Sequence, residues 1–159
     1  MIEWIELNVP GFGILKLEHL VSDYTGTLSL DGKLLPGIKE KLTKAAQSLK
    51  IHVLTADTFG TAKAELADAP CEVHIITGEN LDVQKEDYVK KLGAEKVVAF
   101  GNGINDRKML KVARLGIVVT GNEGCAVESL LAADVHVTNV KDGIDLLLNP
   151  KRLKAILRF

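Results

Sequence analysis

This chain of 159 residues is poor in cysteine and has no long apolar run, and each shortage excludes a class of protein. The two cysteines, Cys71 and Cys125, form neither a Cys-x-x-Cys pair nor a cluster with zinc-ligand spacing, which indicates reduced thiols that pack as small apolar side chains. No apolar run approaches the roughly 18 residues of a membrane helix. Residues 1–7 carry no basic residue, unlike a signal peptide. We therefore expect a cytoplasmic protein that has no membrane partner.

An excess of charge of one sign is also missing, which argues against nucleic acid as a partner. Lys and Arg number 20 and Asp and Glu number 21, so the net charge is −1, whereas a domain that binds a nucleic acid backbone is usually clearly basic. Apolar residues make up 47% of the chain, which is enough for a core and too many for a disordered segment. With no repeat and no low-complexity linker, residues 1–159 are predicted to form a single domain.

Two hairpins are predicted in the first part of the chain. Residues 2–7 and 14–21 both alternate between apolar and polar side chains around a Pro-Gly-Phe-Gly turn, so they predict an N-terminal β-hairpin whose second strand runs into the core. Residues 27–35 predict a smaller hairpin, because their Asp-Gly pair favours a tight primed turn.

Short apolar strands then alternate with helices. The expected strands are residues 51–55, 71–76, 96–100, 115–119 and 135–137. The expected helices are residues 38–49, 58–68, 81–92, a segment that begins near 105, and residues 124–133, 143–148 and 153–159. Strands that are apolar throughout, each followed by a helix, predict an α/β fold of three layers, a Rossmann-like parallel sheet with helices on both faces.

Polar side chains gather where ligands of such a sheet bind, just beyond the carboxyl ends of the strands. The set comprises Asp23, Thr55, Asp57, Asn102, Asp106 and, on a covering helix, Lys85. Two carboxylates can hold Mg²⁺, which prefers oxygen ligands, and one of them can also act as a nucleophile. A hydroxyl and an ammonium group can neutralise phosphoryl oxygens. The sequence therefore predicts a phosphate site with a metal ion.

Four segments, in order, resemble the motifs of the haloacid dehalogenase-like (HAD) superfamily. Residues 23–28, Asp-Tyr-Thr-Gly-Thr-Leu, resemble motif I with the threonine that P-type ATPases have at its third position, and residues 54–57, Leu-Thr-Ala-Asp, resemble their motif II. Residues 85–92 resemble the segment around the motif III lysine, and residues 101–110 resemble the motif IV loop. The resemblance spans residues 14 to about 135, and the whole chain is similar to the soluble P-type-ATPase-like phosphatases.

This resemblance implies a role for each matched residue. Asp23 would attack phosphorus, form an aspartyl-phosphate and bind Mg²⁺, and the backbone carbonyl of Thr25 would join the Mg²⁺ shell. Thr55 and Lys85 would hold the phosphoryl group, and Asp106 would bind or orient the metal. The implied function is Mg²⁺-dependent phosphoryl transfer, a slow phosphatase activity on a phosphorylated substrate.

Two residues depart from the family pattern. HAD phosphatases have an aspartate, the general acid and base, at the position of Thr25, and a threonine cannot transfer protons near pH 7; the loss of such a group slows a reaction ~10²–10⁴-fold. The motif IV loop usually has aspartate where this chain has Asn102, whose amide oxygen is a possible Mg²⁺ ligand without charge. A non-catalytic binding or regulatory module is therefore the alternative function, and a response-regulator-like phosphoryl acceptor is a third.

Several residues also have a purely structural interpretation. Lys85 has lysine neighbours that could take its role, Asn102 could be a turn residue, and Asp106 could be a helix N-terminal charge. The four histidines, His19, His52, His74 and His136, are scattered over predicted strands and are expected as core or edge residues.

The spacing between the motifs leaves no room for a large cap. Only about 30 residues separate Thr55 from Lys85, and these already contain a predicted helix and strand. An open site suits a macromolecular substrate, or a homo-oligomer in which a neighbouring protomer covers the site.

Overall fold

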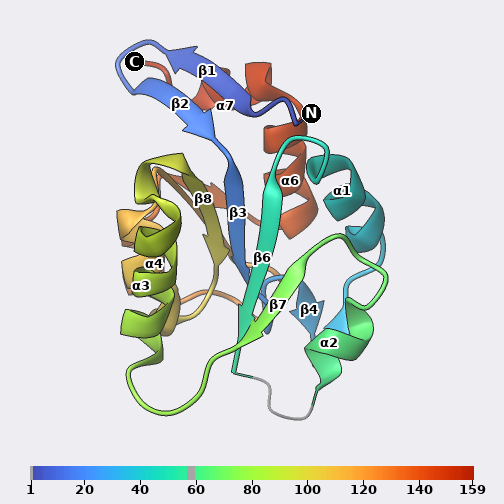
Figure 1. The fold of residues 1–159 in the computed structure, drawn as a ribbon. Helices are drawn as coiled ribbons and strands as arrows, with labels where there is room; N and C mark the ends of the chain where they lie inside the picture. The colour runs from blue at the N-terminus through green and yellow to red at the C-terminus, as the bar shows by residue number, and fades with distance from the viewer. Residues whose placement is uncertain (1, 57–59) are drawn as a thin grey trace.

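The centre of the fold is a parallel sheet, seen in Figure 1 in a computed structural model that describes residues 2–56 and 60–159. Its six strands lie in the order β10, β9, β8, β3, β6, β7, and each neighbouring pair is parallel. Their bounds are β3 His19–Asp23, β6 Lys50–Thr55, β7 Glu72–Ile75, β8 Val97–Gly101, β9 Leu115–Val119 and β10 Val135–Val137. Strands β8 and β9 are buried along their whole length, as apolar strands covered on both faces must be.

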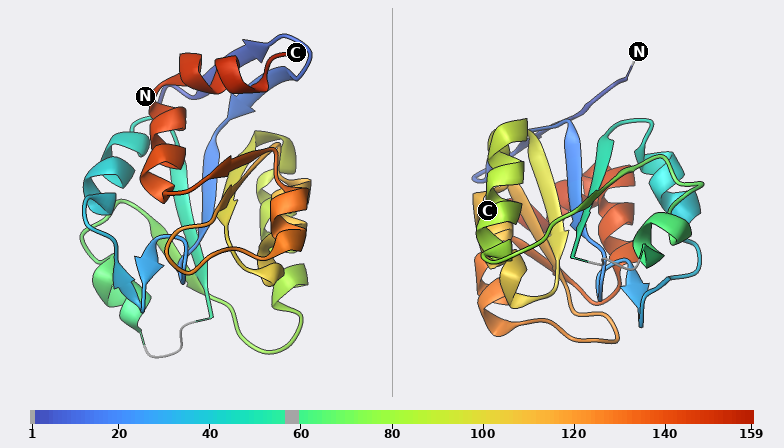
Figure 2. Two further views of the ribbon diagram at one scale, coloured as in Figure 1. Left: turned by 180° about the vertical axis from the view of Figure 1, so that it is seen from behind. Right: turned by 60° about the horizontal axis from the view of Figure 1, so that its bottom comes forward.

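Helices cover both faces of this sheet, which confirms the predicted three-layer α/β fold (Figure 2). The bounds are α1 Ile38–Ala45, α2 Thr61–Glu65, α3 Leu81–Leu92, α4 Arg107–Val112, α5 Val127–Ala132, α6 Val140–Leu148 and α7 Pro150–Leu157, with short 3₁₀ turns η1 Ala94–Lys96 and η2 Ile104–Asp106. One core contains Leu42 and Ile144 from α1 and α6, and the other contains Val89 and Met109 from α3 and α4. Cys71 and Cys125 are free and half-buried against these two cores.

The N-terminal hairpin is confirmed, but its second strand is not continuous with the core strand. Strand β1 (Ile5–Val9) pairs antiparallel with β2 (Gly13–Leu17) in a sheet of their own, and the chain then passes through Glu18 into β3. The prediction of one strand over residues 14–21 is therefore wrong. The backbone of Glu18 donates to the carbonyl of Lys96, which directly precedes β8, and accepts from the N–H of Lys50, the first residue of β6 (both 2.9 Å), so it is held at the entry to the central sheet.

The last two helices begin earlier than their apolar pattern predicts. Helix α6 begins at Val140 rather than residue 143, because the side chain of Asn139 accepts a hydrogen bond from the N–H of Lys141 (2.9 Å) and caps the helix. Helix α7 begins with Pro150, at the first helical position, where proline is favoured. The predicted start of the 58–68 helix lies outside the described residues, and within them α2 begins only at Thr61.

The small hairpin, β4 (Ser29–Leu30) and β5 (Lys33–Leu34), is confirmed and lies beside the carboxyl ends of the central strands (Figure 1). Asp31 and Gly32 have φ angles of 52° and 83°, as a primed turn requires. The Tyr24 hydroxyl donates to the carbonyl of Gly32 (2.8 Å) and ties the hairpin to β3. Among the described residues no domain-sized insertion interrupts the core elements, in agreement with the expected lack of a large cap. None of the described helices has the length and apolarity needed to cross a bilayer.

Candidate active site

The carboxyl ends of β3, β6 and β8 surround an open cavity of about 400 Å³. All four predicted catalytic residues line this cavity: Asp23, Thr25, Thr55 and Lys85. The predicted metal ligand Asn102 lines it as well. Asp106 lies behind them and has no exposed surface. The fold therefore brings together all six predicted site residues, whereas Asp57 lies outside the described residues.

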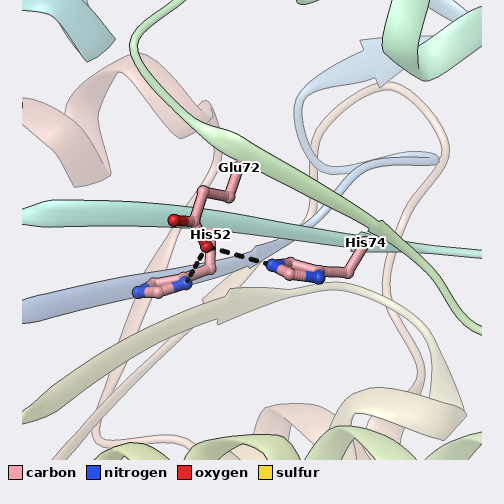
Figure 3. Close-up of side chains that lie close together, drawn as sticks. All are labelled: His52, Glu72 and His74. Atoms are coloured by element: carbon pink, nitrogen blue, oxygen red, sulfur yellow. Dashed lines mark hydrogen bonds and ion pairs between the residues drawn. The ribbon is translucent and has the colours of Figure 1, made fainter.

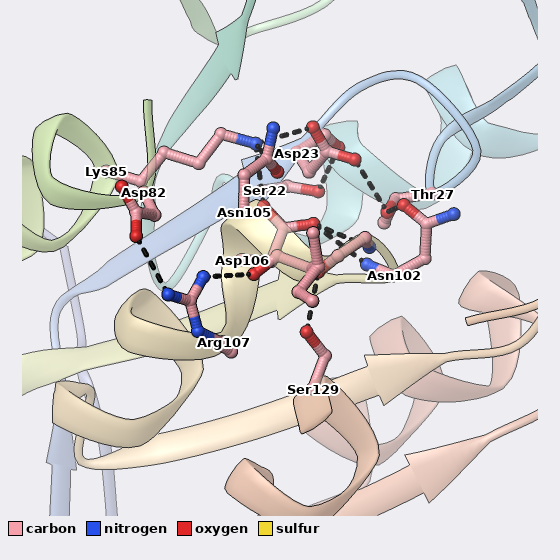
Figure 4. Close-up of polar contacts among 12 residues, drawn as sticks. Ser22, Asp23, Thr27, Asp82, Lys85, Asn102, Asn105, Asp106, Arg107 and Ser129 are labelled. Atoms are coloured by element: carbon pink, nitrogen blue, oxygen red, sulfur yellow. Dashed lines mark hydrogen bonds and ion pairs between the residues drawn. The ribbon is translucent and has the colours of Figure 1, made fainter. Parts of the chain in front are cut away.

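Asp23 is the last residue of β3 and is 7% exposed. Its Oδ1 accepts a hydrogen bond from Lys85 Nζ (2.9 Å), and its Oδ2 accepts one from Thr27 Oγ1 (3.2 Å) (Figure 4). Burial, followed by the charge of Asp106, raises the pKa of the Asp23 carboxyl from 3.8 to about 7, and the contacts with Lys85 and Thr27 only partly oppose this. The environment of Asp23 therefore favours additional positive charge.

Lys85 projects from α3 into the site and is 2% exposed. Its ammonium group donates to three oxygens, Oδ1 of Asp106 (2.7 Å), Oδ1 of Asp23 (2.9 Å) and Oδ1 of Asn105 (3.1 Å). Burial favours the neutral amine, but the two carboxylates outweigh it and raise the pKa of Lys85. Lys85 is therefore a buried cation of the site, and the solvated-lysine interpretation is wrong.

Asp106 connects Lys85 to the loop that follows β8. Its Oδ1 accepts from Lys85, and its Oδ2 accepts from the backbone N–H groups of Asn102 and Gly103 (both 3.0 Å). A Cβ atom on Gly101 would lie only 2.6 Å from the Asp106 side chain, so this close approach requires glycine there. Asp106 is fully buried and does not line the cavity, so its position suits orientation of Lys85 and of the loop after β8.

Asn102 and Thr25 lie on the solvent side of this cluster. The Asn102 amide oxygen is 3.3 Å from Thr27 Oγ1, and its Nδ2 donates to the carbonyl of Gly124 (3.3 Å). Thr25 is exposed, whereas Thr55 is 2% exposed at the end of β6. The three residues predicted to hold Mg²⁺ from this side, Asp23, Thr25 and Asn102, all line the cavity, and the Asp23 carboxylate and Asn102 amide are oxygen donors of the kind that a hard cation prefers.

Four residues of the site had no predicted role. Thr27 contacts both Asp23 and Asn102, and Asn105 contacts Lys85; both lie inside the motif segments, so their positions carried a signal. Ser129 donates to the carbonyl of Gly103 (2.6 Å), and Glu123 lines the cavity. These two come from segments after β9 that resemble no motif, and only the fold brings them to the site.

The charges of the cluster suit a divalent cation. Asp23, Asp106 and Lys85 together carry one excess negative charge when all three are ionised, and Asp23 and Lys85 lie 2.9 Å apart in a buried setting. Excess negative charge with oxygen donors beside it is the environment that Mg²⁺ prefers. The residues present therefore fit such an ion.

Comparison with known sequences places the chain among relatives of P-type ATPases. It is 45% identical over 73 residues to the uncharacterised protein MJ0073 of Methanocaldococcus jannaschii, a match that covers 46% of this chain and 78% of that protein. It is 39% identical over 98 residues to a probable copper-exporting P-type ATPase of Archaeoglobus fulgidus, covering 58% of this chain but only 12% of that ATPase. No protein-family model matches the chain.

Comparison with solved structures identifies the fold. A 3-deoxy-D-manno-octulosonate 8-phosphate phosphatase of Moraxella catarrhalis, crystallised with magnesium, phosphate and KDO, has a TM-score of 0.69 at 17% identity and is similar over 84% of this chain and 86% of its own. A zinc-transporting PIB-type ATPase has a TM-score of 0.63 at 23% identity, over 77% of this chain and 20% of its own. The chain therefore belongs to one family with MJ0073, has the fold of haloacid dehalogenase-like phosphatases, and is similar in sequence to a part of P-type ATPases.

Proposed function

We propose that this protein is a Mg²⁺-dependent phosphohydrolase that works through an aspartyl-phosphate on Asp23. The observation that carries the proposal is the buried cluster of Asp23, Lys85 and Asp106 at the wall of an open cavity. A carboxylate held against a fixed ammonium group is suited to attack a phosphoryl group whose oxygens need neutralisation. The Moraxella phosphatase crystallised with magnesium and phosphate supports the same chemistry by analogy of fold.

In the first step, a carboxylate oxygen of Asp23 attacks phosphorus. A new O–P bond forms, the bond between phosphorus and the ester oxygen breaks, and the leaving group departs with its electron pair. Lys85 stabilises the negative charge of the transferring phosphoryl group, and Thr55, which lines the same cavity, is placed to donate a hydrogen bond to it. Mg²⁺ bound by Asp23, the Thr25 carbonyl and Asn102 would supply further positive charge for the phosphoryl oxygens.

In the second step, water attacks phosphorus, the acyl phosphate bond breaks, and phosphate and the Asp23 carboxylate are released. This water must lose a proton, and Thr25 has no carboxylate to take it. We infer that the second step is slow and that phosphoenzyme accumulates. The threonine thus makes the protein a slow phosphatase rather than an inactive one, because the first step needs no general base.

The substrate is a phosphorylated molecule whose body extends into solvent. The cavity is open, and its lining comes from α3 and from the segments at the carboxyl ends of β3, β6, β7, β8 and β9, with no separate cap among the described residues. An open site of this kind accepts a macromolecular phosphoester, or it is completed by a neighbouring protomer in a homo-oligomer.

Covalent labelling tests the proposal. The protein is incubated with Mg²⁺ and acetyl phosphate, quenched in acid and weighed intact by mass spectrometry. We expect one added phosphoryl group in the wild type and none in Asp23→Asn. Asp31→Asn, which makes the same change on the exposed hairpin turn, serves as the matched control and keeps the label. Equal absence of label in the wild type and Asp23→Asn, with Mg²⁺ bound, would favour the binding-module function instead.

A further inference from the structure

Three of the histidines lie in one cluster: they are core or edge residues, as expected, but they are not scattered in the fold. His52 lies on β6, and Glu72 and His74 lie two residues apart on the edge strand β7, where Glu72 is the register partner of His52 (Figure 3). His19 of β3 and Tyr88 of α3 complete the group, with ring centroids 5.2 Å and 5.5 Å from that of His52. The fourth, His136, lies on β10 at the opposite edge of the sheet.

The donor atoms of His52, Glu72 and His74 are spaced as a small metal ion would space them. Glu72 Oε2 lies 3.2 Å from His74 Nε2 and 3.7 Å from His52 Nδ1, and the three ligand atoms all lie within 4.8 Å of one another. A tetrahedral ion with bonds of about 2.0–2.1 Å separates its ligands by roughly 3.4 Å. Two of the three separations therefore bracket that value, and only the two imidazoles need to approach each other.

Both ring nitrogens of His52 have polar neighbours. The Tyr88 hydroxyl lies 2.7 Å from Nδ1, and His19 Nδ1 lies 3.1 Å from Nε2. In the tautomer whose Nε2–H donates to His19, the lone pair of Nδ1 is available on the side of Glu72, and an ion bound there would replace the contact with Tyr88. A metal-bound histidine is normally held by an acceptor on its other nitrogen, which is the place of His19 here.

No lysine or arginine in the described part of the chain neutralises Glu72. Among the described residues, the ion-pair contacts of Glu72 are to His52 and His74 alone. The side chains of Glu72 and His74 are 70% and 40% exposed, so an ion can reach them from solvent.

We propose that His52, Glu72 and His74 form a binding site for a divalent transition-metal ion of the Zn²⁺ class, distinct from the Mg²⁺ site. Two imidazoles and one carboxylate favour Zn²⁺, Ni²⁺ or Cu²⁺ over Mg²⁺, which prefers oxygen alone. The three protein ligands leave the fourth position to a solvent molecule. The ion joins the edge strand β7 to β6 and so stabilises the strand that ends in Thr55. This site does not depend on the proposed phosphohydrolase activity.

Zn²⁺ binding is measured by calorimetry and by thermal unfolding, in a buffer with Mg²⁺ in large excess to occupy the oxygen site. We expect one Zn²⁺ per chain and a rise in Tm with Zn²⁺ concentration. His74→Gln and Glu72→Gln, both at partly exposed positions, should each weaken Zn²⁺ binding at least ~10-fold, since even loss of an outer hydrogen-bond partner has effects of that size. Circular dichroism confirms that both variants are folded.

Three controls decide where the ion binds. His136→Gln makes the same change at the far edge of the sheet and should retain wild-type affinity, as should Cys71→Ser and Asp23→Asn. The proposal is overturned if Zn²⁺ does not bind, if His74→Gln and Glu72→Gln bind it like the wild type, or if Asp23→Asn or Cys71→Ser alone abolishes binding. In the last case the ion belongs to the active site or to the thiol.

Discussion

Lys85 and Tyr88 lie one turn apart on α3 and contact two different polar clusters, since Lys85 Nζ is 2.9 Å from Asp23 Oδ1 and the Tyr88 hydroxyl is 2.7 Å from His52 Nδ1. Strand β6 also contributes to both clusters, since His52 lies within it and Thr55 is its last residue. The candidate active site and the histidine cluster therefore share one helix and one strand.

Removing the Lys85 charge should strongly destabilise the protein as well as inactivate it. Lys85→Met leaves the carboxylates of Asp23 and Asp106 facing each other without a cation in a buried site, and breaking a buried pair in this way costs about 3–5 kcal/mol. Urea unfolding at pH 8 without Mg²⁺ measures the loss. Lys91→Met, on the exposed side of the same helix, should change the free energy of unfolding by no more than about 0.5 kcal/mol. Similar losses in both variants would mean that the ion cluster contributes nothing specific.

Asp23→Asn should become more stable relative to the wild type as pH rises. The folded-state pKa of Asp23, about 7, lies above the ordinary value of 3.8, so its contribution to stability is fully present below about pH 4 and is lost as pH rises through 7. Asparagine does not titrate, and the difference in unfolding free energy between pH 5 and pH 8 should be on the order of a few kcal/mol. Denaturant titrations at both pH values without Mg²⁺ test this. Parallel curves for the two proteins would show that Asp23 is ionised throughout, and added Mg²⁺ should reduce the difference.

Asn102→Asp should bind Mg²⁺ about ten times more tightly. A carboxylate a few ångströms from the ion gains a few kcal/mol at an effective dielectric of ~20, before the loss from desolvation. The Nδ2 of Asn102 donates to the Gly124 carbonyl, so an oxygen in its place would repel that carbonyl and lower the Tm without metal. Mg²⁺ titration of the Tm should therefore show a lower starting point and a larger rise. An unchanged affinity would mean that residue 102 does not reach the ion.

Thr25→Asp should shorten the lifetime of the phosphoenzyme. The new carboxylate would stand at the exposed rim of the cavity and accept the proton of the attacking water, for which the gain is ~10²–10⁴-fold. Acid-quenched time courses after removal of the phosphoryl donor give the rate of label loss. Thr25→Asn has the same shape without the base and should behave like the wild type. If the asparagine variant lost label as quickly as the aspartate variant, space rather than proton transfer would limit the second step.

The fold was largely readable from the sequence because its signals are local. Apolar runs such as residues 97–101 and 115–119 specify buried parallel strands, and the Asp31-Gly32 pair specifies its turn. The break at Glu18 could not be predicted, because the strand-like apolar pattern of residues 14–21 continues through it. Only hydrogen bonding to segments distant in the sequence separates β2 from β3. The earlier start of α6 depends on one capping side chain, Asn139, rather than on the apolar pattern.

Of the polar clusters described above, the candidate active site was predicted from the sequence and the histidine cluster was not. Asp23 and Asp106 were predicted from motifs at strand ends, because parallel strands place their carboxyl ends along one edge, and Lys85 was predicted from a motif on the covering helix. The histidine cluster was missed, because His52 and His74 come together only when β6 and β7 pair in their actual register. No short sequence pattern records a register between strands that are separated by a helix.

The small hairpin over the site also bears on which phosphoesters react. Between β3 and α1, the described residues offer only β4 and β5 to contact a leaving group, and Thr25 supplies no proton to it. The departing oxygen would therefore carry away nearly its full negative charge in water. Rates of enzyme phosphorylation by a series of aryl phosphates should fall steeply as the parent phenol becomes less acidic. Bulky substituents at the far end of the ring should matter little. The ease of breaking the bond between phosphorus and the phenol oxygen, rather than the shape of the leaving group, would then set the order of reactivity.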